Sequence, residues 1–512
     1  MKKTLLFGAI SAILTNTAMA DELDPLSAAE RHQQAYDYRE QQANINFINS
    51  PAEHPNNSDE TDVPNYAGQF HKTLPHAANG IVASAAYQQL LTAIQAGSFA
   101  AFEQVPAGGP VKLANPLAAQ VYDLEGRDSH AYGMKPAPAL GSAEAAAEMV
   151  EVYAQALLRD VPFSEYTSNK NIMKAANELA NLIDFTGPTS AELLFRGIFE
   201  GDQTGPYISQ FLYKDIPTGP KVVDQKYTRY KAGENFMTTP SEWLAIENGQ
   251  MPSKSVTTQA ARYMLNGRDL SRYVHQDYTY QAFHNAALIM LSWGPSVWDD
   301  GNPYKTATRQ GAFIDLGAGE ILDTVAKAGN AALRAAWFQK WNVHRRLRPE
   351  EYGGLAQNNP SLLHAQFNSS IVLNYVQAQY GNKLLPMGYP EGAPTHPAYP
   401  AGHASISGAC VTVLKAFFKE GATIPSPVQP SANGSVLEPI ADVLTIGGEL
   451  NKLASNISLG RDWAGVHYRS DGTEGMLLGE EVGIAILKDW RDAHPEAPTL
   501  TLKKFDGEEI QI

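Results

Sequence analysis

The sequence predicts a mainly α protein built of helical bundles, with a polar N-terminal arm and a short C-terminal β-hairpin. Three observations support this fold class. Apolar residues recur at three- and four-residue spacing along several long segments that are rich in Ala, Leu and Glu or Gln. Segments with the alternating pattern of a strand are few. The 512 residues are 44% hydrophobic and 18% charged, which permits a large buried core and argues against dominant disorder.

The first twenty residues have the pattern of a bacterial secretory signal peptide. Two lysines precede an apolar run from Leu5 to Leu14, and Ala18-Met19-Ala20 forms a small-x-small cleavage site before Asp21. The apolar run is too short to span a bilayer as a helix. We therefore expect a periplasmic or secreted protein that is not held in a membrane.

Composition limits both the partners and the chemistry. Acidic residues outnumber basic ones by 54 to 39, which gives a net charge of −15. Because nucleic acids and anionic membranes attract positive surfaces, we expect neither as a partner. The single cysteine, Cys410, lies in an apolar run and is expected to be a buried helical thiol. One thiol excludes an intrachain disulfide and multi-cysteine metal sites, so the chemistry falls to His, Lys, Arg, Asp or Glu.

Beyond the signal peptide the chain divides into four parts. Residues 21–70 are polar and contain Asn- and Pro-rich stretches, and we expect an extended arm that lies on the body or on a partner subunit. A helical region follows over 71–265, then a helical bundle over 266–495 and a tail over 496–512. No shift in composition marks the boundary near residue 265.

Each expected element follows from a local pattern. Residues 201–230 are rich in Gly, Pro and aromatic residues and are expected to be irregular, whereas the tail contains a hairpin over 500–512 with Asp506-Gly507 at its turn. The expected helices span residues 82–96, 142–158, 169–183, 278–291, 320–347, 361–380, 402–418, 443–459 and 472–490.

The first of three segments that carry charge into the bundle runs from Trp337 to Pro349. Lys340, His344 and Arg348 are spaced i, i+4, i+8, which predicts one stripe along a helix that Pro349 ends. A solvated basic helix end is the alternative, since the helix dipole favours cations there. The surrounding residues are strongly apolar, however, and a buried cation needs an anion.

The second segment runs from Pro394 to Ser405. It contains His396 and, seven residues later, His403. Pro400 suits the first turn of the helix that follows, and Gly402 would let a backbone N–H approach a ligand closely. Free N–H groups at the start of a helix bind anions.

The third segment runs from Asn456 to Asp471 and contains Arg461 and His467. These two are six residues apart, which places them on different faces of a continuous helix, but Gly465 between them indicates a break that would turn both inward. The alternative is a capped joint between two helices with Ser470 or Asp471 as the N-cap. Together the three segments predict a pocket for an oxyanion, held by one Lys, two Arg, a helix N-terminus and two or three His.

In their order and spacing these segments resemble the signature of the vanadium-dependent haloperoxidases, within the superfamily that includes the type 2 phosphatidic acid phosphatases and bacterial acid phosphatases. The resemblance is closest to the red-algal bromoperoxidase branch. It rests on the seven residues between Lys340 and Arg348, on His396 seven residues before His403, and on Gly-Arg-x-x-Ala-Gly-Val-His-Tyr at 460–468. It is strong over residues 337–481 and fainter upstream.

The resemblance implies a vanadate cofactor and a role for each matching residue. His467 would bond the vanadium, while Lys340, Arg348, Arg461 and the N–H of Gly402 would hold its equatorial oxygens. His403 would exchange a proton with the axial oxygen, His396 would tune halide oxidation, and Trp337 would pack beside the site. Hydrogen peroxide, a halide, with bromide expected, and a small organic acceptor would be the substrates. The family also implies a homo-oligomer, which the N-terminal arm would suit.

One residue departs from the family pattern. Pro-Ser-Gly-His is Pro-Ala-Gly-His here, so Ala401 lacks the hydroxyl that usually bonds an equatorial oxygen. Two alternatives therefore stay open. One is a secreted acid phosphatase in which His467 forms a phosphohistidine and His403 protonates the leaving group. The other is an oxyanion-binding relative without activity.

Overall fold

The computed structural model describes residues 26–48, 51–494, 496 and 498–512. The predicted signal peptide lies outside these residues. The chain divides at residue 50 into two units, of which the larger, Pro51–Ile512, is one compact unit that includes both sides of the division predicted near residue 265. That division stays a prediction. None of the described helices is long and apolar enough to cross a membrane.

The described part of the first unit is a single helix, α1, Ala28–Ile48. The expectation of an extended arm over this stretch is wrong. Ser27 and Glu30 form a reciprocal cap, in which the Ser27 N–H donates to Glu30 Oε2 over 2.9 Å and the Glu30 N–H donates to Ser27 Oγ over 3.4 Å. Many residues of α1 are good helix formers, such as Ala, Gln, Glu and Arg. Their helix propensity outweighs the lack of an apolar face.

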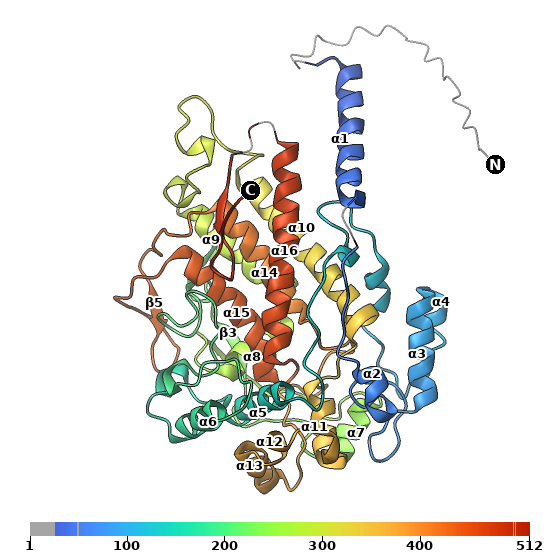
Figure 1. The fold of residues 1–512 in the computed structure, drawn as a ribbon. Helices are drawn as coiled ribbons and strands as arrows, with labels where there is room; N and C mark the ends of the chain where they lie inside the picture. Colours follow the sequence, from blue (N-terminus) through green and yellow to red (C-terminus); the bar gives the residue numbers. More distant parts are fainter. Residues whose placement is uncertain (1–25, 49–50, 495, 497) are drawn as a thin grey trace, which may run out of the picture. The chain divides into compact units, whose positions relative to one another are not determined.

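The second unit is mainly helical, which confirms the predicted fold class (Figure 1). Its helices are α2 (Asp59–Asp62), α3 (Ser84–Ala96), α4 (Phe99–Phe102), α5 (Ala143–Leu158), α6 (Lys170–Ala180), α7 (Pro240–Glu247), α8 (Gly267–Gln276), α9 (Gln281–Ser292), α10 (Ala318–Phe338), α11 (Pro349–Asn358), α12 (Ala365–Asn368), α13 (Ile371–Tyr380), α14 (Gly402–Phe417), α15 (Ile446–Ala464) and α16 (Arg469–Ala493).

Strands occur only as short antiparallel pairs among the described residues. The predicted C-terminal hairpin is confirmed, and Gly507 in its turn has a φ of +89°, a conformation that favours glycine. Two of the other pairs lie in or beside the stretch that was expected to be irregular. The pairs are β1 (Ile216–Thr218) with β2 (Lys221–Val223), β3 (Tyr227–Tyr230) with β4 (Thr258–Arg262), β5 (Val428–Pro430) with β6 (Leu437–Pro439), and β7 (Thr501–Lys503) with β8 (Glu509–Gln511).

The core is centred on α14, which packs against α10, α15 and α16 (Figure 1). Almost every residue of α14 is buried, and Cys410 is fully buried as expected. Glycines allow the closest contact: a Cβ on Gly408 would lie 2.0 Å from the Met476 carbonyl oxygen, and one on Gly479 would lie 2.0 Å from that of Ser405. The backbones of α14 and α16 therefore touch, and the N-terminus of α14 is held firmly at one end of the bundle.

The prediction of one helix over 320–347 with three basic residues on a stripe is wrong. α10 ends at Phe338 and continues as a π-helical turn, Gln339–His344. Arg345 then takes a φ of +42°, and Arg348 is the N-cap of the next helix, α11. The wider π turn and this reversal interrupt the regular spacing of an α-helix. The directions of these side chains therefore cannot be predicted from helical spacing.

The joint between α15 and α16 also differs in detail. α15 ends where Gly465, at a φ of +82°, reverses the chain, so the predicted break at this glycine is confirmed. The N-cap of α16 is Tyr468, not Ser470 or Asp471. Asp471 instead accepts the Tyr468 N–H over 3.2 Å from the first turn of α16. Pro400 precedes Ala401, the N-cap of α14, and so lies just outside the helix.

Candidate active site

The three cations predicted from the sequence are buried and have no carboxylate partner among the described residues. Lys340 and Arg348 are fully buried, and Arg461 is 4% exposed. Within the described parts of the chain, no Asp or Glu oxygen lies within ion-pair distance of their side-chain nitrogens. Burying a charge without a counterion is unfavourable, so this arrangement favours a bound anion.

The neighbouring arginines show the contrast. Arg345 pairs with Glu60 at 2.7 Å and Arg346 pairs with Glu148 at 2.9 Å. These pairs neutralise both guanidinium groups inside the protein. Lys340, Arg348 and Arg461 have no such pair and keep a positive charge that no carboxylate of the described residues neutralises directly.

Lys340 and Arg348 point toward the loop that leads into α14. Lys340 Nζ donates to the carbonyl oxygens of Pro397 and Ala398, each over 2.7 Å. Arg348 Nε donates to the His396 carbonyl oxygen over 2.8 Å. Burial, and then the positive charge of Arg348, lowers the pKa of Lys340 well below its usual value, and burial lowers the pKa of Arg348 to about 10. An anion bound here would offset this loss of charge.

Arg461 approaches the same region from α15. Its Nη1 donates to the Val274 carbonyl oxygen over 2.6 Å, and its guanidinium carbon lies 5.6 Å from the centre of the Tyr389 ring. Its buried Nε has no hydrogen-bond acceptor among the described residues. A buried N–H without an acceptor is costly, so this atom is available to a ligand.

His467 is held in one orientation by a carboxylate. Its Nδ1 lies 2.8 Å from Asp471 Oδ2, and its Nε2 lies 2.9 Å from Arg348 Nη1. Asp471 accepts a hydrogen bond from Nδ1–H, which leaves Nε2 unprotonated and turned toward Arg348. Burial, and then Arg348, lowers the pKa of His467 well below its usual value. An imidazole with one nitrogen fixed by a carboxylate and the other unprotonated is the usual form of a metal-ligating histidine.

His396 completes the group around Arg348. Its Nδ1 lies 2.9 Å from Arg348 Nη2, and its ring centre lies 4.6 Å from that of Trp337. Trp337 also lies under Lys340, whose Nζ is 5.9 Å from the indole ring centre. The aromatic wall is thus in contact with both a cation and a histidine of the group.

The start of α14 contributes Gly402 and His403. A Cβ on Gly402 would lie 3.1 Å from Leu333 and 3.2 Å from the Trp337 ring, so a larger residue would crowd this wall. The first N–H groups of a helix have no intrahelical acceptor and attract anions. His403 Nε2 lies 3.0 Å from Asp277 Oδ1, and the His403 side chain is 28% exposed, which gives it access to solvent.

The structure therefore joins most of the predicted residues and leaves two at the edge. Trp337, Lys340, Arg348, His396 and His467 form a continuous set of contacts, and Gly402 lies against Trp337. Arg461 and His403 instead contact a carbonyl oxygen and a carboxylate. His344 is separate, because its ring packs edge-on against Tyr399 with centres 4.7 Å apart.

Sequence reasoning missed two carboxylates that orient the histidines. Asp471 lies four residues after His467, so its i, i+4 spacing was a usable signal although it was weighed only as a cap. Asp277, just after α8, is 126 residues from His403 in the chain, and no local pattern could connect them. Both act on histidines and leave the three cations unpaired.

These residues fit a small, highly charged oxyanion. Three cations, an unpaired Arg461 N–H and a helix N-terminus supply donors, and His467 Nε2 supplies one lone pair for a metal centre. Vanadate needs both kinds of group, oxygen-binding donors and one nitrogen ligand. The donor set is therefore suited to it.

Comparisons with known proteins point the same way. A family model described as the VCPO second helical-bundle domain matches residues 321–494. The vanadium-dependent bromoperoxidase of Ascophyllum nodosum is 34% identical over 528 residues, covering 96% of this chain and 94% of that protein. That of Corallina pilulifera is 34% identical and covers 89% of this chain and 92% of its own.

A solved structure has the same fold over nearly the whole length. The homohexameric structure of the second vanadate-dependent bromoperoxidase from Ascophyllum nodosum matches with a TM-score of 0.92 at 33% identity, and the match covers 100% of this chain and 94% of that chain. With the buried cations, the oriented histidine and relatives that match from end to end, the chain belongs to the vanadium-dependent bromoperoxidase family.

Proposed function

We propose that this protein binds vanadate and uses hydrogen peroxide to oxidise a halide, with bromide expected, to a hypohalous acid equivalent that halogenates organic acceptors. The observation that carries the proposal is the set of three buried cations without carboxylate partners beside the unprotonated Nε2 of His467. Relatives over the full length carry the name bromoperoxidase. They do not favour the phosphatase or the inactive alternative.

The cations bind and orient the oxyanion in this proposal. Lys340, Arg348 and Arg461 neutralise its charge, and the N–H of Gly402 adds a donor that needs no side chain. Vanadate, when bound, supplies a Lewis acid that activates hydrogen peroxide toward a halide without a change of oxidation state. His467 is its nitrogen ligand, and Asp471 keeps that nitrogen free of a proton.

His403 is the proton-exchanging residue in this proposal. Asp277 accepts from Nε2–H, which leaves Nδ1 to take or release a proton. Its partial exposure suits a group that exchanges protons with solvent. His396 stays neutral, since burial, and then Arg348, lowers its pKa well below the usual value, and its ring against Trp337 forms the wall where it would tune halide oxidation.

The test is a pair of assays on the mature protein after incubation with orthovanadate. Peroxide-dependent bromination of a phenol dye is measured beside hydrolysis of p-nitrophenyl phosphate. We expect vanadate-dependent bromination. Phosphate release without bromination would move the assignment to a phosphatase, and the absence of both activities would favour the inactive relative.

Localisation and assembly are two further parts of the proposal. We propose that residues 1–20 are removed on export to the periplasm or the medium, because they combine a basic start, an apolar run and a cleavage site. Edman sequencing of the exported protein should begin at Asp21, and a protein that keeps Met1 would contradict this. We also propose a homo-oligomer, because the solved relative is homohexameric. Light scattering of the mature protein should give a multiple of the chain mass.

A further inference from the structure

A second cluster of polar side chains lies where the segment before α3 meets the end of α7. It consists of His71 and His76, which lie between α2 and α3, and Glu247, the last residue of α7. One ligand atom from each of these three residues lies within 4.8 Å of the others. His71 Nδ1 and His76 Nε2 are 2.9 Å apart. None of the three belongs to the motifs that carry the proposed oxidation chemistry.

Glu247 is the unusual member of the cluster. Its side chain is fully buried, and neither carboxylate oxygen has a hydrogen-bond partner among the described residues. Buried carboxylates in folded proteins are ordinarily paired or hydrogen-bonded, or coordinate a metal. Here one imidazole nitrogen of each of two histidines lies within 4.8 Å of a Glu247 oxygen.

The charges around the cluster favour a cation. Glu350 and Glu351 are buried and act on the charge of Glu247, and Lys72 Nζ lies 2.5 Å from Glu350 Oε1. Arg348 is the second cation that acts on Glu350 and Glu351, so three carboxylates against two cations leave an excess of negative charge when all are ionised. Burial, and then Glu350 and Glu351, raises the pKa of Glu247 well above its usual value, and a cation bound beside it would oppose that shift.

We infer that His71, His76 and Glu247 bind one divalent transition-metal ion, with zinc as the best match, at a structural site distinct from the proposed vanadate site. Two imidazoles and a carboxylate form a ligand set that zinc prefers, whereas calcium and magnesium prefer oxygen alone. In a tetrahedral zinc site two nitrogen ligands lie roughly 3.3 Å apart. The two rings need to separate by only a few tenths of an ångström from their 2.9 Å contact.

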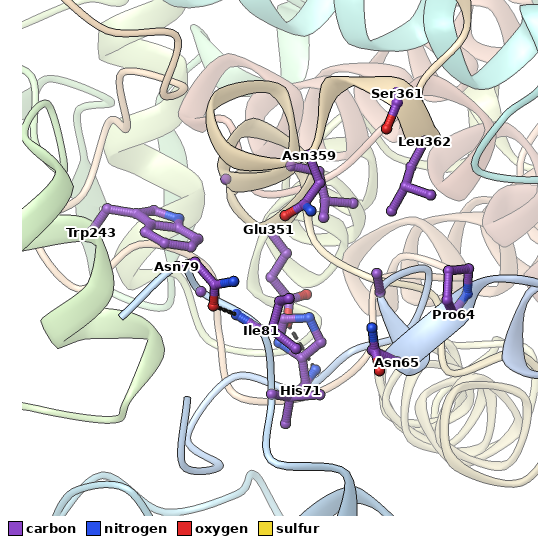
Figure 2. Close-up of a pocket in the computed structure, with 15 residues that line it drawn as sticks. Pro64, Asn65, His71, Asn79, Ile81, Trp243, Glu351, Asn359, Ser361 and Leu362 are labelled. Atoms are coloured by element: carbon purple, nitrogen blue, oxygen red, sulfur yellow. Dashed lines mark hydrogen bonds and ion pairs between the residues drawn. The ribbon is translucent and has the colours of Figure 1, made fainter. Parts of the chain in front are cut away.

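A cavity gives the ion a route to this site. It has a volume of about 110 Å³ and is lined by His71 and Glu351, with Trp243 and Asn79 on its wall (Figure 2). Figure 2 shows the His71 and Glu351 side chains directed toward each other, and His71 Nδ1 lies 3.1 Å from Glu351 Oε1. Water from this cavity can complete the four ligands of zinc.

The ion would add to the contacts that join three segments of the chain. Glu351 Oε1 accepts the backbone N–H groups of His71, over 2.8 Å, and Lys72, over 3.0 Å. Its other oxygen accepts the backbone N–H of Arg348 over 2.6 Å. Glu351 thus holds the segment around His71 to the start of α11, and the ion would add a link from that segment to the end of α7, so its effect should appear in stability.

The experiment measures zinc binding directly, without vanadate. Tag-free mature protein is dialysed against dipicolinate and then titrated with zinc chloride, with bound metal measured by mass spectrometry and stability by thermal unfolding. We expect one zinc ion per chain and a Tm that rises with zinc concentration. If the parent protein retains no more zinc than a blank without protein, and its Tm does not change with zinc, the proposal is overturned.

Two variants and a control locate the site. Glu247→Gln keeps the shape of a side chain whose oxygens make no hydrogen bond among the described residues, so the metal-free protein should fold without loss of Tm. His76→Gln alters the more exposed histidine. Each should weaken zinc binding at least tenfold, the lower end of the loss expected even for groups behind the ligands. Glu480→Gln, which removes a buried carboxylate elsewhere, should bind zinc like the parent protein. Equal binding by all three variants would contradict the assignment.

Discussion

Asp471 determines which ring nitrogen of His467 carries the proton. Its Oδ2 accepts from Nδ1 over 2.8 Å, so an Asn at this position would no longer fix the tautomer by charge. We expect Asp471→Asn to weaken vanadate binding by about 10- to 100-fold, the range for a lost partner of a metal-ligating histidine. Vanadate titration of the metal-free protein measures this.

Asp471 also pairs with Arg346, so the variant needs a matched control. Glu148→Gln removes the other carboxylate of Arg346 and leaves His467 Nδ1 bonded to Asp471. If both variants weaken vanadate binding equally, Asp471 acts through Arg346 and not through His467.

Vanadate affinity and kcat should distinguish the role of His467 in metal binding from the role of His403 in proton exchange. His467→Ala removes the nitrogen ligand and should abolish bromination even with excess vanadate. His403→Ala should leave vanadate bound and slow turnover by about 10²- to 10⁴-fold, the usual contribution of a general acid or base. Affinity and kcat, measured on both variants, test the assignment. Full activity in both would show that these positions do not carry the chemistry.

At the scale of the element, the N-cap of α14 is the point where this chain departs from its family. Ala401 is fully buried and has no side-chain group to bond a ligand or the helix. A serine there would add one hydrogen bond to a charged partner, worth about 1.5–3 kcal/mol. We expect Ala401→Ser to tighten vanadate binding by roughly one to two decades. Titration of the metal-free variant checks it.

A hydroxyl at an N-cap can also bond the helix itself, so stability is measured in parallel. The control is Ala404→Ser, which adds a buried hydroxyl in the first turn of α14, directly after His403. If Ala401→Ser gains about 1 kcal/mol of stability with no change in vanadate affinity, the hydroxyl caps α14 and does not meet the oxyanion.

Long helices could be predicted from the sequence because their apolar spacing reports one buried face. α5, α14 and α16 therefore lie within a few residues of their predicted ranges. The π turn at Gln339–His344 could not be predicted, since a shift in the backbone hydrogen-bond pattern does not change the spacing of apolar residues in the sequence. α1 was missed for the opposite reason, as it is a helix of good propensity without an apolar stripe.

At the scale of the whole molecule, the candidate site joins segments from Trp337 to His467, and the order of the three motifs was enough to predict most of its members. Motifs identify residues whose types are fixed by chemistry. They do not identify what orients those residues across the fold, and Asp277, on the loop after α8, is the example. Packing of α14 against its three neighbouring helices brings these distant parts together.

The same burial that makes the site makes the whole fold sensitive to acid. His344 is a useful probe, because it is 5% exposed, has no hydrogen bond on either ring nitrogen among the described residues, and is not a proposed ligand. Burial, and then Arg345, lowers its pKa to about 3, whereas in the unfolded chain it titrates near the usual 6.5.

The sign follows from these two values. Below pH 6.5 His344 binds a proton in the unfolded chain but not in the folded protein. The stability due to a neutral His344 is therefore lost as the pH falls toward 3. The slope is about 1.4 kcal/mol per pH unit. Because the slope reaches its full value only below pH 6.5, the parent should lose about 2 kcal/mol more than His344→Gln, which cannot titrate, between pH 6.5 and 4.5. Urea unfolding at both pH values measures the difference, with His32→Gln as a control in α1. Parallel losses in the parent and His344→Gln would mean that His344 is protonated in the folded protein as readily as in the unfolded chain.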